Sequence, residues 1–543
     1  MLASDLLRFT CAFQPIKIIE GKEKGKRKNM AEPEAPTTRA RGRSNRRPPA
    51  GGHEAAAVLA GVELRIRPYD LLSEESLLAI EDAAAVILEE IGIEFRDDPE
   101  SLDLWRAAGA KVDGELVRFP RGMLGPILKT APSMFRQHAR NPARSLKIGG
   151  PHAVFAPAYG SPFVRDLDGG RRYGALVDFQ NFVKLAYSIP WLHHSGGTVC
   201  EPVDIPVNKR HLDMVSAHLR YSDKPFMGSV TSMERAEDSI EMARIVFGRE
   251  FVDQNCVILA NINANSPLVF DATMTGALKV YARANQGAVI VPFILGGAMG
   301  PVTTPGAIAQ SLAETMVGCA LTQLVRPGAP TIFGNFLSST DLRTGSPTFG
   351  TPEPALGSLV VGQLARRLGL PLRCSGAFTS SKVADGQAMM ESAVAMQAAV
   401  QCGANFILHS AGWLEGGLTM GYEKLILDAD FCSALHVYMA GLSVNPNQLA
   451  LEAFREVGPG NHFFGCGHTI ANYRTAFWES EVADNNSFEQ WRDAGEKDAL
   501  VRANARWKKL LAEYEAPPLE TAIDNELADF CARKKSAQPD QWY

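Results

Sequence analysis

Aromatic side chains recur directly after apolar runs of this sequence, where they could hold a positively charged ligand. Tyr159, Phe336, Phe378 and Trp413 each follow such a run and have small polar residues around them. The face of an aromatic ring attracts a quaternary ammonium group, so the pattern indicates a pocket for a ligand with an apolar cationic head. The alternative is that these rings only fill the interior of the fold.

Polar and charged residues in the same loops are the other candidates for a site: Asn265, Asp341, Lys382, Asp385, His409 and Glu415. Glu415 lies between glycines and apolar residues, which favours a function for its carboxylate. The others have structural alternatives. Asp341 could cap a turn, and Asp385 could cap the helix that follows it. Lys382 could be solvated, and His409 could be a core histidine.

Motifs of the common cofactor and nucleophile chemistries are missing. The nearest candidate for a phosphate-binding turn is GGAMGP at 296–301, which is neither GxGxxG nor part of GxxxxGK[ST]. The histidines form no HExxH pattern, the nine cysteines include no CxxC, and no GxSxG surrounds a serine. We therefore expect no nucleotide cofactor, no metal and no serine nucleophile, and we expect reduced thiols in a cytoplasmic protein.

The candidate residues belong to an eightfold alternation of apolar runs and amphipathic stretches. The runs occupy 154–160, 195–203, 225–232, 256–263, 288–297, 330–337, 372–378 and 406–412, and the predicted helices occupy 175–188, 207–221, 233–247, 271–286, 306–324, 353–368, 385–401 and 422–441. Runs without polar alternation are typical of parallel strands that are buried on both faces. The sequence predicts an α/β fold, a (β/α)8 TIM-type barrel at 151–441 with its site on the loops after the strands. An open doubly wound sheet is the alternative.

The segments outside the predicted barrel differ in character. Residues 1–54 are basic, rich in proline and poor in apolar residues, which predicts a disordered tail, and residues 1–29 could be an over-extended reading frame. A helix capped by Ser73 opens a helical N-terminal region at 55–150, and 442–543 form a C-terminal helical extension. We expect both to pack on the barrel as helical additions.

Charge and hydropathy exclude two classes of partner. The chain of 543 residues has 55 Lys and Arg against 60 Asp and Glu, so it lacks the concentrated positive charge that nucleic acid requires. The longest uncharged run, near 284–313, is interrupted by prolines and glycines, which argues against a membrane helix. A small-molecule ligand and a homo-oligomeric protein remain the expectation.

Three segments together resemble the trimethylamine methyltransferase family: SSTDLRTGSPTFGTPE at 338–353, SSKVADGQA at 380–388 and AGWLEGGLTMGYEKLILD at 411–428. The likeness covers about 60–520. Members of this family are barrel proteins that move a methyl group from a methylamine to the cobalt of a corrinoid protein. The resemblance implies a corrinoid (cobalamin) carried by a partner protein, since this chain has no DxHxxG motif of a corrinoid-binding domain.

One departure from the family pattern concerns the amine-activating residue. Family members that demethylate trimethylamine carry pyrrolysine just before a segment that resembles 379–388, and by this match Phe378 holds that place here. Phenylalanine forms no covalent adduct with an amine. The chain therefore resembles the branch without pyrrolysine, which includes glycine betaine methyltransferases and begins with a quaternary amine.

The resemblance also implies roles for the candidate residues. Phe378 would face the quaternary nitrogen, with Trp413, Phe336 and Tyr159 as further walls of the substrate pocket and His409 and Asp341 near it. Glu415, Lys382 and Asp385 are the candidate catalytic side chains, with Glu415 balancing the charge and Lys382 or Asn265 holding a substrate carboxylate. Methyl transfer to tetrahydrofolate, or binding of betaine without catalysis, remains an alternative.

Overall fold

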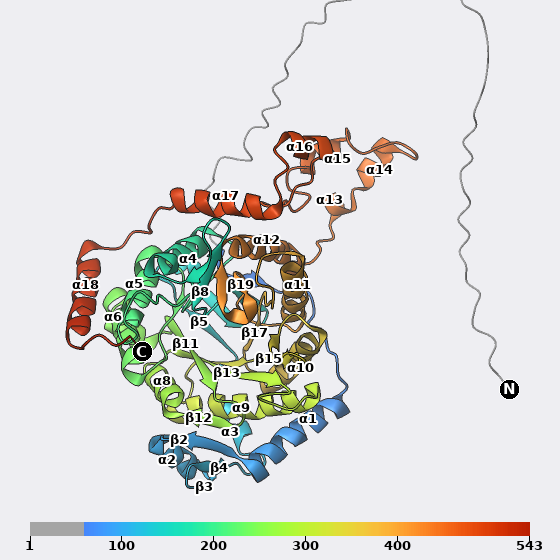
Figure 1. Ribbon diagram of the computed structural model, residues 1–543. Helices are drawn as coiled ribbons and strands as arrows, with labels where there is room; N and C mark the ends of the chain where they lie inside the picture. Colours follow the sequence, from blue (N-terminus) through green and yellow to red (C-terminus); the bar gives the residue numbers. More distant parts are fainter. Residues whose placement is uncertain (1–58, 543) are drawn as a thin grey trace, which may run out of the picture. The chain divides into compact units, whose positions relative to one another are not determined.

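Seven parallel strands form the centre of the structure, a computed structural model that describes residues 59–542 (Figure 1). Their order across the sheet is β10 (Phe226–Met227), β11 (Ile258–Ala264), β13 (Gly287–Gly296), β14 (Thr331–Gly334), β17 (Leu372–Ser375), β18 (Phe406–Leu408) and β7 (His152–Phe155). β7 comes first in the chain and last across the sheet. Seven of the eight predicted strand runs therefore contain a strand of this sheet. The expectations for residues 1–54 lie outside the described residues.

The eighth predicted run, at 195–203, forms no strand. Its first part nevertheless lies between the two end strands of the sheet. The backbone N–H of His193 donates to Phe155 at 3.0 Å, and that of Ser195 donates to Pro225 at 2.8 Å. The N–H of Met227 in β10 donates to Gly196 at 2.8 Å. Gly196 has a φ of 91°, which interrupts an extended conformation, so residues 193–197 connect β7 and β10 without a regular ladder.

The helices follow the strands where the sequence predicts them. They are α4 (Leu176–Ser188), α5 (Arg210–Tyr221), α6 (Met233–Phe247), α8 (Ala272–Arg283), α9 (Thr304–Val325), α10 (Pro352–Leu368), α11 (Gly386–Gln401) and α12 (Tyr422–Met439). In Figure 1 they surround the central strands. Local signals set their ends: Asp385 accepts a hydrogen bond from the N–H of Ala388 at the start of α11, and Gly369 in a left-handed conformation ends α10. The predicted α/β class is confirmed.

Two apolar clusters lie on the two faces of the strands. Side chains on one face pack against the helices, and those on the other form a separate inner cluster that includes Val154, Met227, Leu259, Val289, Val291, Ile332, Phe406 and Leu408. Neighbouring strands contribute residues in register, such as Val289 opposite Ile332. Burial on both faces explains why the runs lack polar alternation.

The N-terminal region is not only helical. It contains α1 (Glu74–Val86), α2 (Pro99–Ala108) and α3 (Leu124–Leu128), and also the strands β1 (Val62–Glu63), β2 (Ile93–Arg96), β3 (Lys111–Asp113), β4 (Leu116–Arg118), β5 (Met134–Gln137) and β6 (Leu146–Gly149). β2 pairs in parallel with β12 (Val269–Asp271), while β5 and β6 extend the central sheet beyond β7. The expectation of a purely helical region missed these strands because their pairings are distant in sequence or very short.

The regular elements of residues 442–542 are helices. They are α13 (Pro446–Leu449), α14 (Leu451–Val457), α15 (Gly467–Asn472), α16 (Phe488–Asp493), α17 (Ala499–Ala512) and α18 (Thr521–Ser536). α17 packs against α12, where Trp507 donates to Glu423 at 2.9 Å. Of residues 442–495, only Ala453, Cys466 and Val482 are buried. In the part of the chain that the structure describes, no helix is both long and apolar enough to span a membrane, and the eight cysteines are all free.

Candidate functional site

The predicted aromatic residues meet at the carboxyl ends of the central strands. Phe336, Phe349, Phe378, His409 and Trp413 form one group, here called the aromatic cluster. Its ring centroids lie 4.8 Å apart for Phe336 and Phe378, 4.5 Å for Phe378 and Trp413, and 4.5 Å for His409 and Trp413. Phe336 follows β14 in β15 (Phe336–Thr340), and Trp413 lies in β19 (Trp413–Leu414). Phe349 is the member that the sequence patterns did not single out.

The members of the aromatic cluster differ in exposure. Phe378 and Trp413 are 3% and 4% exposed, whereas Phe336 is partly exposed. A chain turn covers Trp413, since a Cβ on Gly417 would lie 2.4 Å from Cη2 of its ring. The cavity behind Phe378 has a volume of about 10 Å³, which is room for about one water molecule. The expectation that both rings are open to the ligand is therefore not met in this conformation, because the rings pack on each other.

Three rings lie on the face of the strands that carries the inner cluster: Phe336, its neighbour Phe293 and Tyr159. Phe293 lies 4.6 Å from Phe336, centroid to centroid, and all three side chains are partly exposed. Tyr159 and Phe336 both contact the inner apolar cluster. These three rings, and not Phe378 and Trp413, offer a free surface to a ligand that enters at this end of the strands.

His409 connects the aromatic cluster to Tyr159. Its Nδ1 accepts a hydrogen bond from the backbone N–H of Tyr159 at 3.1 Å, so a proton of the neutral ring is on Nε2. Burial, and secondarily the positive charge of Arg373, lower the pKa of His409 well below its ordinary value. A neutral imidazole adds no positive charge beside a cationic ligand.

Three further buried histidines use Nδ1 in the same way. His193 accepts from the N–H of Phe155 at 2.9 Å, His194 from that of Gly196 at 2.9 Å, and His218 from the hydroxyl of Ser195 at 2.7 Å. Burial lowers the pKa of all three, to about 4 for His218. Four neutral rings therefore hold the segments 155–159 and 193–197 at the edge of the site.

Arg373 is a site residue that the sequence analysis did not single out. It lies in β17 opposite Phe406, a member of the inner cluster, and paired residues on parallel strands point to the same face. Its side chain is 1% exposed, donates from Nη1 to the carbonyl of Asn335 at 2.6 Å, and stands 5.1 Å from the ring centroid of Phe336. The available signal was a single arginine inside an apolar strand run.

The structure places the charged candidates outside the aromatic cluster, each with a partner of its own. Glu415 forms a two-pronged ion pair with Arg171 at 2.8 and 3.2 Å. Lys382 is exposed and donates to the carbonyl of Ser380. Asp385 caps α11, which is the structural alternative considered for it. A catalytic role for Glu415, Lys382 or Asp385 stays a prediction.

Asp341 and Asn265 also have local partners. Asp341 accepts from the N–H of Arg343 at 2.9 Å and so caps the turn in its loop. Asn265 is exposed and exchanges two hydrogen bonds with Asp271 at 2.8 and 3.1 Å. Asp341 thus matches its structural alternative, and the contribution of both residues to ligand binding is an open expectation.

A buried ion pair supports the loops that carry the aromatic cluster. The side chains of Lys424 and Asp428 on α12 are both fully buried and lie 2.5 Å apart. Lys424 also donates to the hydroxyl of Ser392 on α11 at 2.9 Å, and Asp428 accepts from the N–H of Gly412 at 2.9 Å. The pair therefore connects two helices to the turn that precedes Trp413.

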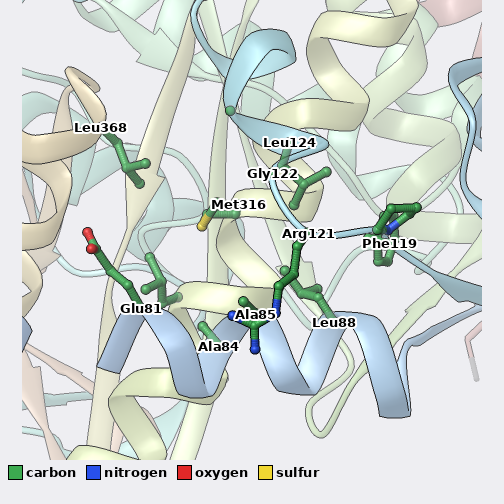
Figure 2. Close-up of a pocket in the computed structure, with 13 residues that line it drawn as sticks. Glu81, Ala84, Ala85, Leu88, Phe119, Arg121, Gly122, Leu124, Met316 and Leu368 are labelled. Carbon is green, nitrogen blue, oxygen red and sulfur yellow. The ribbon is translucent and has the colours of Figure 1, made fainter. Parts of the chain in front are cut away.

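A separate apolar cavity lies away from the aromatic cluster. Figure 2 shows it between α1 and the turn at 119–125, with a volume of about 200 Å³. Its lining is apolar except for Glu81 and Arg121, and Arg121 is paired with Asp82 and Glu89. It brings together no acid and base that could react, so the aromatic cluster and the interior beside it remain the candidate site.

Comparison with known proteins identifies the family of this chain. The family model described as trimethylamine methyltransferase matches residues 39–539. Glycine betaine methyltransferase of Desulfitobacterium hafniense (strain Y51) is 41% identical over 86% of this chain and 97% of its own length. Proline betaine:corrinoid methyltransferase of Eubacterium limosum is 27% identical over 83% and 93%, and a trimethylamine methyltransferase of D. hafniense (strain DSM 10664 / DCB-2) is 26% identical over 86% and 94%.

Proposed function

The chain belongs to the trimethylamine methyltransferase family, and on this premise we propose that it transfers a methyl group from a betaine-like quaternary amine to the cobalt of a corrinoid protein. The 41% identity to a glycine betaine methyltransferase along nearly its whole length supports this substrate class. The name of the proline betaine relative supports a corrinoid as the acceptor substrate, and in this proposal a partner protein carries it.

Phe378 is the observation that carries this proposal. By its match to the family pattern at 379–388, it holds the place where members that act on trimethylamine have pyrrolysine, and its ring is buried against Trp413. A phenyl ring cannot activate a tertiary amine covalently. A quaternary amine needs no such activation, since the C–N bond breaks with its electron pair going to nitrogen and a neutral tertiary amine leaves. The electron pair of the reduced cobalt forms the new bond to carbon.

The side chains of the site hold and align the substrate. Phe336, Phe293 and Tyr159 offer ring faces to the ammonium group, and each such contact contributes roughly 0.5–2 kcal/mol. The neutral His409 behind them avoids repulsion of the cation. A low-dielectric pocket that positions one methyl group toward the open end of the strands accelerates the transfer mainly through alignment.

The proposed architecture for this site is a (β/α)8 barrel at 151–441 with additions at 55–150 and 442–543. The hydrogen bonds of residues 193–197 to Phe155, Pro225 and Met227 support it, because they connect the two ends of the seven-stranded sheet. Residues 193–197 would then take the place of the second strand. The site would lie at the carboxyl ends of the strands, as in other barrels of this kind.

Incubating the purified chain with chemically reduced cobalamin and a panel of amines tests the function. We expect methylcobalamin, seen in the visible spectrum, to form from a carboxylated quaternary amine such as glycine betaine and not from trimethylamine. Efficient transfer from trimethylamine would overturn the proposal. Affinity for betaine without turnover would instead indicate a binding protein, and methylation of tetrahydrofolate in place of cobalamin would indicate the other acceptor.

A further inference from the structure

The positively charged side chain of a buried arginine lies on the face of the central strands that carries the inner cluster. Arg373 is fully buried in β17, and its pairing with Phe406 and Gly334 directs its side chain to the face that carries the inner cluster. Guanidinium groups are rarely buried without a counterion, because removing the charge from water costs several kcal/mol.

Arg373 has no carboxylate partner among residues 59–542. Its Nη1 donates to the carbonyl of Asn335, while its Nε is buried without any acceptor. Burial lowers the pKa of Arg373 to about 10, and the only charge that opposes this is the neighbouring Cys374. At neutral pH the guanidinium is still a cation, so the interior holds a positive charge that no carboxylate of residues 59–542 neutralises.

Its surroundings fit one type of molecule. Arg373 stands 5.1 Å from the centroid of Phe336, whose ring is partly exposed beside Phe293 and Tyr159. A betaine carries a carboxylate one methylene away from its quaternary nitrogen, so a single molecule can reach the guanidinium and an aromatic face together.

We infer that Arg373 is the carboxylate anchor of the substrate and sets the preference for carboxylated quaternary amines; this rests on the function proposed above. Arginine presents a planar fork that binds both oxygens of a carboxylate. The roles expected for Lys382 and Asn265 pass to Arg373, because Lys382 is exposed and Asn265 is paired with Asp271.

The test compares glycine betaine with choline, which has the same trimethylammonium head and a hydroxymethyl group in place of the carboxylate. Both are assayed by methylcobalamin formation and by calorimetric binding, with the parent, Arg373→Met and Arg373→Lys. We expect Arg373→Met to raise KM and Kd for betaine roughly 10- to 100-fold with little change for choline. Arg373→Lys keeps the positive charge but loses the planar guanidinium. Its KM and Kd for betaine should therefore lie between those of the parent and those of Arg373→Met.

Arg366→Met is the matched control, because Arg366 pairs with Asp70 at the surface and should leave both substrates unaffected. An unchanged betaine-to-choline ratio in the Met and Lys variants would overturn the assignment of Arg373. If Arg373→Met does not fold, Arg373→Lys alone decides by the same ratio. If the parent neither demethylates nor binds any quaternary amine, the proposed function itself is refuted.

A second, independent observation concerns residues 442–488, here called the projecting segment. It includes α13, α14 and α15, which in Figure 1 lie beyond α12 and α17. Its large apolar residues are exposed by 38–98%: Leu442, Val444, Leu449, Leu451, Phe454, Phe463, Phe464, Ile470, Tyr473, Phe477, Trp478 and Phe488. At about 150–250 Å² for a large side chain, this is on the order of 1,500 Å² of apolar surface.

We propose that a second copy of this chain covers the projecting segment. The exposed apolar area exceeds the ~800 Å² that each partner contributes to an interface of standard size and matches an obligate interface. The corrinoid protein that accepts the methyl group has to associate and dissociate in every catalytic cycle, which suits a smaller and more polar interface. A permanent partner is therefore the better fit to this surface, and it accounts for the expected homo-oligomer.

The oligomeric state of the full chain tests this. Light scattering after size-exclusion chromatography should give a multiple of 58.8 kDa for the parent. Phe464→Asp and Phe477→Asp, at positions 87% and 86% exposed, should shift the mass to that of one chain, while Leu78→Asp on α1 should not. A monomeric parent, or Asp variants that stay oligomeric, would overturn the proposal; Asp variants that instead lose affinity for the corrinoid partner would assign the surface to that protein.

Discussion

Lowering the pH from 7 to 5 should destabilise this protein by roughly 5 kcal/mol, enough to unfold many domains. His193, His194, His218 and His409 are buried and neutral, and burial holds the pKa of each below its ordinary value. In the unfolded chain each would take up a proton near pH 6.5. Below that pH the unfolded state binds more protons than the folded state, so stability falls as the pH falls.

The size of this effect follows from the number of groups. Each histidine contributes up to about 1.4 kcal/mol per pH unit between its two pKa values. Two buried acids act in the opposite direction: burial raises the pKa of Glu314 and raises that of Asp428 to about 6, so both gain stability on protonation. Four histidines outweigh two acids, and the net slope remains positive with pH.

Urea unfolding at pH 7, 6 and 5 measures the slope. His218→Gln removes one group that takes up a proton on unfolding, while the glutamine can still hydrogen-bond to Ser195 or Gly197. The slope of the unfolding free energy against pH should therefore be shallower by about one proton. The exposed His462 is the matched control, and His462→Gln should leave the slope unchanged. Stability independent of pH between 7 and 5 would show that these histidines are charged in the folded protein.

Replacing Lys424 by Met should lower the free energy of unfolding by about 3–5 kcal/mol. The substitution leaves the buried carboxylate of Asp428 with the N–H of Gly412 as its remaining donor. It also removes the bond from α12 to Ser392 on α11. Since Asp428 holds the turn before Trp413, ligand affinity should fall with stability.

A double variant separates charge from packing. Lys424→Met combined with Asp428→Leu removes both charges and should recover much of the lost stability. Arg455→Met breaks the exposed pair with Glu452 and should have little effect, as surface pairs usually do. Urea unfolding at pH 7 compares all four proteins. A double variant as unstable as Lys424→Met would indicate that shape, not the unpaired charge, accounts for the loss.

The helices and strands were predictable where one local pattern sufficed. Runs such as 288–297 have no polar alternation because both faces of β13 are buried, and Asp385 and Gly369 mark helix ends through their own backbone geometry. The run at 195–203 failed because Gly196, with a φ of 91°, interrupts the extended conformation there. β2 was missed because its partner β12 lies far away in the chain.

The site was predictable in part. Phe336, Phe378 and Trp413 were singled out because their type and their place after the strands coincide, whereas Phe349 and Phe293 were not. The partner of Glu415 was not, since Arg171 is 244 residues away. Arg373 was passed over because one charge in an apolar run looks like an exception to a strand, and only the pairing with Phe406 shows that it points inward.

Gly417 gives the loop above Trp413 a consequence for sequence change within the family. At a φ of 96° and with a Cβ position 2.4 Å from the indole, no residue with a side chain fits there while Trp413 keeps its place. Position 417 can change only if position 413 does: a smaller ring at 413 has to come first, or together with a residue at 417. Substitution at 417 therefore depends on the residue at 413, and a library that varies 417 alone will recover mostly glycine.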